Sequence, residues 1–90
     1  MAEYRLLIKP SAVKEIEAIG SKGDRRRVVE RIAALAREPR PTGSEKLAGS
    51  ESRRRVRQGD YRIVYAVDDA ARVVDIVKVG HRREVYRKGV

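Results

Sequence analysis

Arginines dominate the C-terminal part of this chain, at positions where a small β-sheet would ordinarily carry neutral polar side chains. They occupy Arg53 to Arg57 with one interruption, then Arg62, then the pair Arg82-Arg83. A guanidinium group is planar, permanently charged and able to donate two parallel hydrogen bonds to one phosphate. Like charges crowded on one sheet face are unfavourable unless an anion neutralises them. The pattern therefore predicts a polyanion site, and nucleic acid is the polyanion that we expect.

The net charge supports a localised patch rather than an evenly charged surface. The 90 residues include 22 basic and 13 acidic side chains, a formal net charge of +9. Residues 53–90 hold eleven basic and five acidic residues (+6), whereas residues 1–52 hold eleven and eight (+3). A surface that serves only solubility usually mixes the two signs more evenly. We therefore favour a binding site.

The rest of the composition excludes several classes of chemistry. Cysteine is absent, which excludes disulfides, thiolate metal sites and a cysteine nucleophile. His81 is the only histidine, so a multi-histidine metal site is excluded as well, and we expect neither metal nor cofactor. No apolar stretch is long enough for a signal peptide or a membrane span. We expect one domain, residues 1–90, in the cytoplasm and without a membrane partner.

The N-terminal half predicts a strand followed by two helices. The strand covers Tyr4 to Ile8, and Pro10 with Ser11 marks the start of a helix that Gly20 ends. Asp24 is the predicted cap of the second helix, and Pro39 stops it. The apolar residues expected on the buried stripes of the two helices are Val13, Ile16, Ile19, Val28, Val29, Ile32, Leu35 and Ala36. The two helices are expected to form an antiparallel hairpin.

The C-terminal half predicts three strands, 53–57, 61–67 and 72–79, joined by short turns. A loop over residues 39–52, rich in Pro, Gly and Ser, precedes them and has Leu47 as its one apolar anchor. We expect an α+β fold in the order β-α-α-β-β-β, with an antiparallel sheet and the helical hairpin packed on one face. The first strand is expected to join this sheet.

Alternation along the strands predicts which side chains share a face. Arg53, Arg55 and Arg57 share one face of their strand, opposite Arg54 and Val56. In the next strand, Arg62, Val64 and Ala66 oppose the apolar series Tyr61, Ile63, Tyr65 and Val67. The last strand is mostly apolar and is expected to be central and buried on both faces.

Arg62 is thereby predicted near the middle of the sheet, among apolar neighbours. It either contacts an anion or pairs structurally with Asp75 or Asp60.

Two sequence motifs carry a family resemblance. They are Gly59-Asp60-Tyr61-Arg62-Ile63-Val64-Tyr65 and Val79-Gly80-His81-Arg82-Arg83, the second followed by Tyr86. With the helical hairpin and Lys46-Leu47-Ala48-Gly49, they resemble the RelE/ParE superfamily of toxins from bacterial and archaeal toxin–antitoxin pairs. The resemblance covers nearly the whole chain and implies a cognate antitoxin as partner. RelE-type toxins cut mRNA in the ribosomal A site, whereas ParE-type toxins poison DNA gyrase and lack that nuclease set.

In the RelE branch, the resemblance implies a metal-independent endoribonuclease in which the ribose 2′-hydroxyl attacks the adjacent phosphorus. Its expected partners are the ribosome and mRNA. The residues that match the catalytic set are Arg55, Arg62, Arg82 and Tyr86, and those expected to hold RNA are Arg53, Arg54, Arg57, Arg83 and Arg87.

The chain departs from the RelE pattern at Arg53 and Arg55, where the family has lysines. An arginine cannot be deprotonated in a protein, so Arg55 cannot serve as a general base. Either the site works by charge stabilisation and positioning, or Glu45 or His81 takes the proton. A gyrase-directed toxin without nuclease activity, a plain nucleic-acid-binding module and a catalytically decayed toxin remain as alternatives.

Overall fold

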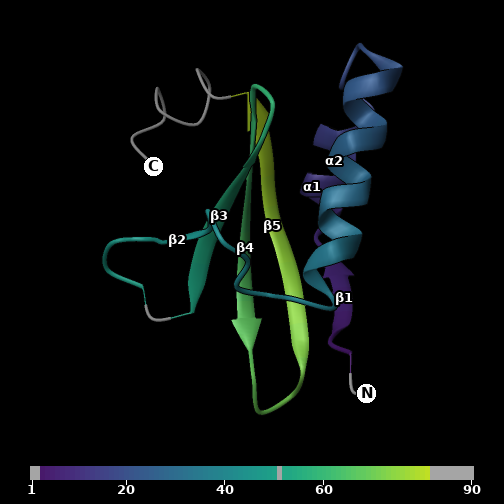
Figure 1. Cartoon of the computed structure of the whole chain (residues 1–90). Coiled ribbons are helices and arrows are strands. Elements are labelled where there is room, and N and C mark those ends of the chain that lie inside the picture. Colours follow the sequence, from purple (N-terminus) through teal and green to yellow (C-terminus); the bar gives the residue numbers. More distant parts are fainter. Residues whose placement is uncertain (1–2, 51, 82–90) are drawn as a thin grey trace.

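The computed structural model describes residues 3–50 and 52–81, which form two helices and a five-stranded sheet (Figure 1). The predicted α+β fold is confirmed. The elements in chain order are β1 (Arg5–Ile8), α1 (Pro10–Glu17), α2 (Lys22–Leu35), β2 (Glu45–Lys46), β3 (Arg53–Gln58), β4 (Tyr61–Asp68) and β5 (Val73–His81).

The strand order in the sheet is β1-β5-β4-β3-β2. Neighbouring strands from β2 to β5 are antiparallel, as predicted. The sheet is nevertheless mixed, because β1 pairs parallel with β5, with Arg5 opposite Val73 and Ile8 opposite Ile76. A parallel pair needs a long connection, which the two helices and strands β2 to β4 together provide. The expectation of a wholly antiparallel sheet was wrong for β1.

Two helix boundaries have clear local causes. Pro10 is the first residue of α1, where its missing N–H costs no hydrogen bond. Ser21 caps α2, because its hydroxyl accepts a hydrogen bond from the backbone N–H of Asp24 at 3.2 Å. The predicted cap, Asp24, instead lies in the first turn, where its negative charge favours the helix dipole.

Both helices lie on one side of the sheet, and the core fills the space between them (Figure 1). The buried residues of α1 are Ala12 and Ile16, with Ile19 just beyond its end, and those of α2 are Val28, Ile32 and Leu35. Val13 and Val29, also predicted to be buried, are 38% and 47% exposed. Each is one position, about 100° of helix rotation, beyond a buried residue, which turns it toward solvent.

The helix-facing side of the sheet contributes Val56, Ile63, Tyr65, Val67, Val74, Ile76 and Val79 to this core. Tyr65 is fully buried, and its hydroxyl donates to the carbonyl of Pro39 at 2.7 Å, which anchors the loop after α2. Strand β5 lies inside the sheet, between β1 and β4, but Val73 and Val77 on it stay partly exposed. The expectation that this strand is buried on both faces was wrong. Leu47, the predicted loop anchor, is half-buried. No helix in the described part of the chain is long and apolar enough to cross a membrane.

Candidate functional site

The face of the sheet away from the helices carries the arginines of β3. Val56 packs into the core, so its neighbours Arg55 and Arg57, and Arg53 beyond them, project from the opposite face. The predicted alternation along this strand is confirmed.

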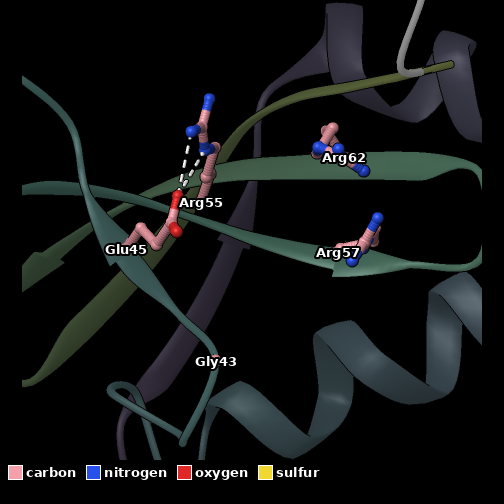
Figure 2. Close-up of a pocket in the computed structure, with 5 residues that line it drawn as sticks. All are labelled: Gly43, Glu45, Arg55, Arg57 and Arg62. Carbon is pink, nitrogen blue, oxygen red and sulfur yellow. Dashed lines mark hydrogen bonds and ion pairs between the residues drawn. The ribbon is translucent and has the colours of Figure 1, made fainter.

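Strand β4 adds Arg62 to the same face. Arg57 is its direct cross-strand partner, and cross-strand partners project to the same side. The side chains of Arg57 and Arg62 lie beside one another on adjacent strands (Figure 2). Arg62 is only 8% exposed, and it is the one charged residue buried among those described. A largely buried guanidinium is held in place by its surroundings, so it can act as a fixed positive group.

These arginines form a pocket of about 210 Å³, which we call the arginine pocket. Its lining residues are Gly43, Glu45, Arg55, Arg57 and Arg62. Strand β2 forms one wall, because Glu45 pairs in register with Arg55. Gly43 begins this wall with a φ of 93°, in the left-handed region that favours glycine.

Glu45 and Arg55, both of which line the pocket, form an ion pair (Figure 2). One carboxylate oxygen of Glu45 accepts from Nη2 of Arg55 at 2.9 Å and from its Nε at 3.2 Å. The Arg55 side chain is 28% exposed and that of Glu45 is 65% exposed. Among the described residues, three guanidinium groups and one carboxylate line the pocket, a set that suits an anion with several oxygens.

The other described arginines predicted to hold RNA divide between the two faces. Arg53 lies on the open face opposite Ala66, beyond the pocket lining. Arg54 lies on the helix-facing side, where its guanidinium donates to the Ser44 hydroxyl at 2.9 Å and 3.2 Å. Arg54 is thus apart from the arginine pocket and supports the loop before β2.

Asp75, one of the two carboxylates considered as a structural partner of Arg62, pairs with Lys9 at 3.4 Å. Asp75 therefore contacts a residue next to β1, and it does not line the arginine pocket.

His81 lies outside the arginine pocket. It is the cross-strand partner of Tyr61, and their rings meet edge to face with centroids 5.6 Å apart. Tyr61 packs against the core, so both rings are on the helix-facing side, near Ile19. The remaining predicted site residues, Arg82, Arg83, Tyr86 and Arg87, lie outside the described residues.

Sequence reasoning missed how Glu45 reaches the pocket. The two-residue strand β2 is too short for any alternation pattern, and it lies within a loop rich in Pro, Gly and Ser. Gly43 was the one local signal for this wall, since a glycine in such a loop commonly marks a left-handed residue.

Comparison with known proteins identifies a family. Residues 6–86 match a family model described as the ParE toxin of the type II toxin–antitoxin system parDE. Toxin RelG of Mycobacterium tuberculosis is 42% identical over 57 residues, which span 60% of this chain and 62% of RelG, less than two thirds of that relative. Toxin RelE of the same organism is 29% identical over 84 residues, 93% of this chain and 87% of the relative.

The fold has close structural relatives as well. The RelE–RelB complex from Pyrococcus horikoshii OT3 contains a chain that superposes with a TM-score of 0.79 and 33% identity, covering 91% of this chain and 97% of that one. Sequence motifs, fold and relatives agree, and the chain belongs to the RelE/ParE superfamily of toxins of type II toxin–antitoxin systems.

Proposed function

We propose that the protein is a RelE-type toxin that cuts mRNA in the ribosomal A site and is neutralised by a cognate antitoxin. The observation that supports this most directly is the arginine pocket, in which Arg55, Arg57 and Arg62 lie together beside the carboxylate of Glu45. A protein that only tracks a nucleic-acid backbone needs exposed cations, not a largely buried guanidinium such as Arg62.

The proposed reaction needs no metal. The 2′-oxygen of the ribose attacks the adjacent phosphorus as it loses its proton, and the bond from phosphorus to the 5′-oxygen breaks. The products are a 2′,3′-cyclic phosphate and a 5′-hydroxyl, once the leaving oxygen has gained a proton. Negative charge builds on the equatorial phosphate oxygens, and Arg62 with Arg55 stabilises it without reorganising.

Glu45 is the proton acceptor that we favour, because among the described residues it is the one carboxylate that lines the arginine pocket. An incoming phosphate competes with Glu45 for Arg55 and places the carboxylate beside the reacting ribose. His81, the other candidate, lies on the opposite face of the sheet. Arg82 would stabilise charge on the leaving oxygen, and Tyr86 would stack on a base or orient the 2′-hydroxyl. Arg53, Arg83 and Arg87 would hold the flanking RNA.

The proposed partners follow from the same site and from the relatives. The P. horikoshii relative was solved in complex with RelB, and we infer that a cognate antitoxin binds this chain and covers the basic face. The net charge of +9 would guide the toxin into a site lined by ribosomal RNA in the cytoplasm.

The test is to map mRNA 5′ ends in a cell-free translation reaction that contains the native protein or its Arg62→Ala variant. We expect cuts within A-site codons with the native protein and none with the variant. Arg26→Ala, which removes an exposed charge on α2, is the control and should cut like the native protein.

Gyrase inhibition is the second candidate, because the matching family model is described as ParE. Intact mRNA with the native protein, together with inhibition of DNA supercoiling by purified gyrase, would replace the nuclease proposal with this one.

A further inference from the structure

Strand β5 loses its neighbour on one edge before it ends. Strand β1 pairs with β5 only as far as Ile8, which lies opposite Ile76. The last hydrogen bond between the two segments runs from the N–H of Lys9 to the Ile76 carbonyl, at 3.0 Å. The segment from Lys78 to His81 continues beyond β1 and is paired on its other edge with β4. A backbone N–H on the uncovered edge of this segment needs another acceptor if it is buried.

Glu15 of α1 supplies that acceptor. One of its carboxylate oxygens accepts from the backbone N–H of Val79 at 2.8 Å, and the other accepts from Nζ of Lys78, also at 2.8 Å. Val79 is 2% exposed, so its N–H is largely shielded from water. Both charged side chains are mostly covered, with 31% of Glu15 and 27% of Lys78 exposed. A single carboxylate therefore replaces the missing strand and neutralises the adjacent charge.

The contact falls immediately after an irregularity in the sheet. Val64 pairs with Lys78 but Tyr65 pairs with Ile76, so Val77 is an extra residue in β5 without a partner in β4. A bulge of this kind is where the register of a strand can change, and it commonly lies next to a functional site. Glu15 binds the first two residues beyond the bulge and so fixes the register of the segment that follows.

That segment pairs with the part of β4 that contributes Arg62 to the arginine pocket. Gly80 is the cross-strand partner of Arg62, and Arg62 is in turn the partner of Arg57. The position of β4 at Arg62 is therefore set on one side by the part of β5 that Glu15 holds.

We propose that Glu15, which does not line the arginine pocket, is a positioning residue for it. Through the Val79 N–H and Lys78, it holds the end of β5 in the register that places Arg62 beside Arg57. This inference rests on the proposed function for its effect on catalysis, but its effect on Arg62 is measurable without any cleavage.

The experiment compares Glu15→Ala, which loses both contacts, with Glu15→Gln, which keeps a neutral oxygen to accept from Val79. Glu17→Ala is the matched control, because it removes an exposed carboxylate from the same helix. Thermal unfolding first establishes the temperature range in which all three variants are folded. Within it, amide exchange at Val79, the NMR signal of the Arg62 Nε–H and the affinity for a short single-stranded 2′-deoxy oligonucleotide are measured.

We expect Glu15→Ala to accelerate Val79 exchange, shift the Arg62 signal and weaken oligonucleotide binding about tenfold. Glu15→Gln should stay within about twofold of the native protein, and Glu17→Ala should match it. A folded Glu15→Ala variant with native Arg62 signal and native affinity would overturn the proposal. The proposal would also be overturned if Glu15→Gln lost as much oligonucleotide affinity as Glu15→Ala. The hydrogen bond to the Val79 N–H would then not be the contact that positions Arg62.

The nuclease proposal and the Glu15 proposal can be rejected independently of one another. A native protein that leaves mRNA intact rejects the nuclease reading, whereas the Arg62 signal in the Glu15 variants still decides whether Glu15 positions the pocket.

Discussion

Arg57 and Arg62 face one another directly across β3 and β4, next to the hairpin turn that joins the two strands. Two like charges in such a pair repel, and the effect is greater here because Arg62 is largely buried. An anion that contacts both guanidinium groups would reduce this repulsion. The pair is therefore suited to bind an anion such as a phosphate.

Replacing one member of this pair is expected to stabilise the free protein while it weakens function. Arg57→Gln should raise the free energy of unfolding by about 0.2–1 kcal/mol at low ionic strength, because it removes the like-charge contact. The same variant should bind single-stranded RNA less tightly than the native protein. Thermal or urea unfolding at low salt, paired with a binding titration, checks both effects.

Arg26→Gln on the exposed side of α2 provides the control, since it removes the same charge away from the pocket. If both variants are more stable than the native protein, the gain comes from the lower net charge alone. If Arg57→Gln is less stable, the argument from repulsion between Arg57 and Arg62 is contradicted.

The salt dependence of RNA binding should distinguish the two faces of β3. Each phosphate contact on a single strand contributes about −0.7 to the slope of log affinity against log salt concentration. Arg53→Gln should therefore make the slope shallower by about 0.7, because Arg53 lies on the open face. Arg54→Gln should change the slope less, because its guanidinium is bound to Ser44 on the other face. Equal changes in slope would mean that the RNA contacts both faces of the strand.

Local patterns predicted the faces of β3 and β4 correctly. A period of two assigns each side chain to one face without reference to the rest of the fold, and burial of Val56 and Ile63 fixes which face is inside. Alternation predicted that Arg55 and Arg57 share a face and that Arg62 lies opposite the apolar side of β4. The register that makes Arg57 and Arg62 direct partners on one surface was not predicted.

The parts of the site that the sequence did not predict depend on contacts between distant segments. Glu15 and Val79 are 64 residues apart, and their hydrogen bond exists because β1 ends before β5 does. Glu45 reaches Arg55 through a strand of two residues, which has no periodicity of its own. The parallel pairing of β1 has the same origin, since a four-residue strand does not encode the direction of its partner.

Tyr65 should link stability to alkaline pH. Burial raises the pKa of the Tyr65 hydroxyl above its ordinary value. Because the folded-state pKa is the higher one, this contribution to stability is complete below about pH 10 and is lost as the pH rises through the folded-state pKa. Tyr65→Phe should lower the free energy of unfolding by about 1–3 kcal/mol near neutral pH, because the buried carbonyl of Pro39 loses its donor.

Urea unfolding from neutral to alkaline pH measures both effects. The decline above pH 10 should be smaller in Tyr65→Phe than in the native protein. Some decline should persist, because the hydrogen bond to Asp69 also raises the pKa of Tyr4. If the free energy of unfolding declines above pH 10 as steeply in Tyr65→Phe as in the native protein, ionisation of Tyr65 is not the cause of the decline.

Asp69 should carry part of the acid sensitivity. Hydrogen bonds from Arg40 and then from Tyr4 lower the pKa of the Asp69 carboxyl. Because the pKa of Asp69 is lower in the folded state, its ionised carboxylate stabilises the fold. This contribution is complete above the unfolded-state pKa, near 3.8, and is lost as the pH falls through the folded-state pKa. Asp69→Asn should therefore be less stable than the native protein at neutral pH, and the difference should shrink toward low pH. A difference that stays constant in acid would contradict this assignment, and unfolding curves at several pH values decide it.

Glu45→Gln should separate binding from catalysis in the arginine pocket. The amide cannot accept the 2′-hydroxyl proton, so cleavage on ribosomes should fall by about 10²–10⁴-fold if Glu45 is the general base. Affinity for a non-cleavable 2′-deoxy oligonucleotide should stay the same or increase, because the variant no longer offers Arg55 a competing carboxylate. Glu38→Gln, which changes an exposed carboxylate outside the pocket, should leave both values unchanged. Native cleavage rates in Glu45→Gln would instead mean that catalysis relies on charge stabilisation by the arginines, with the proton taken up elsewhere.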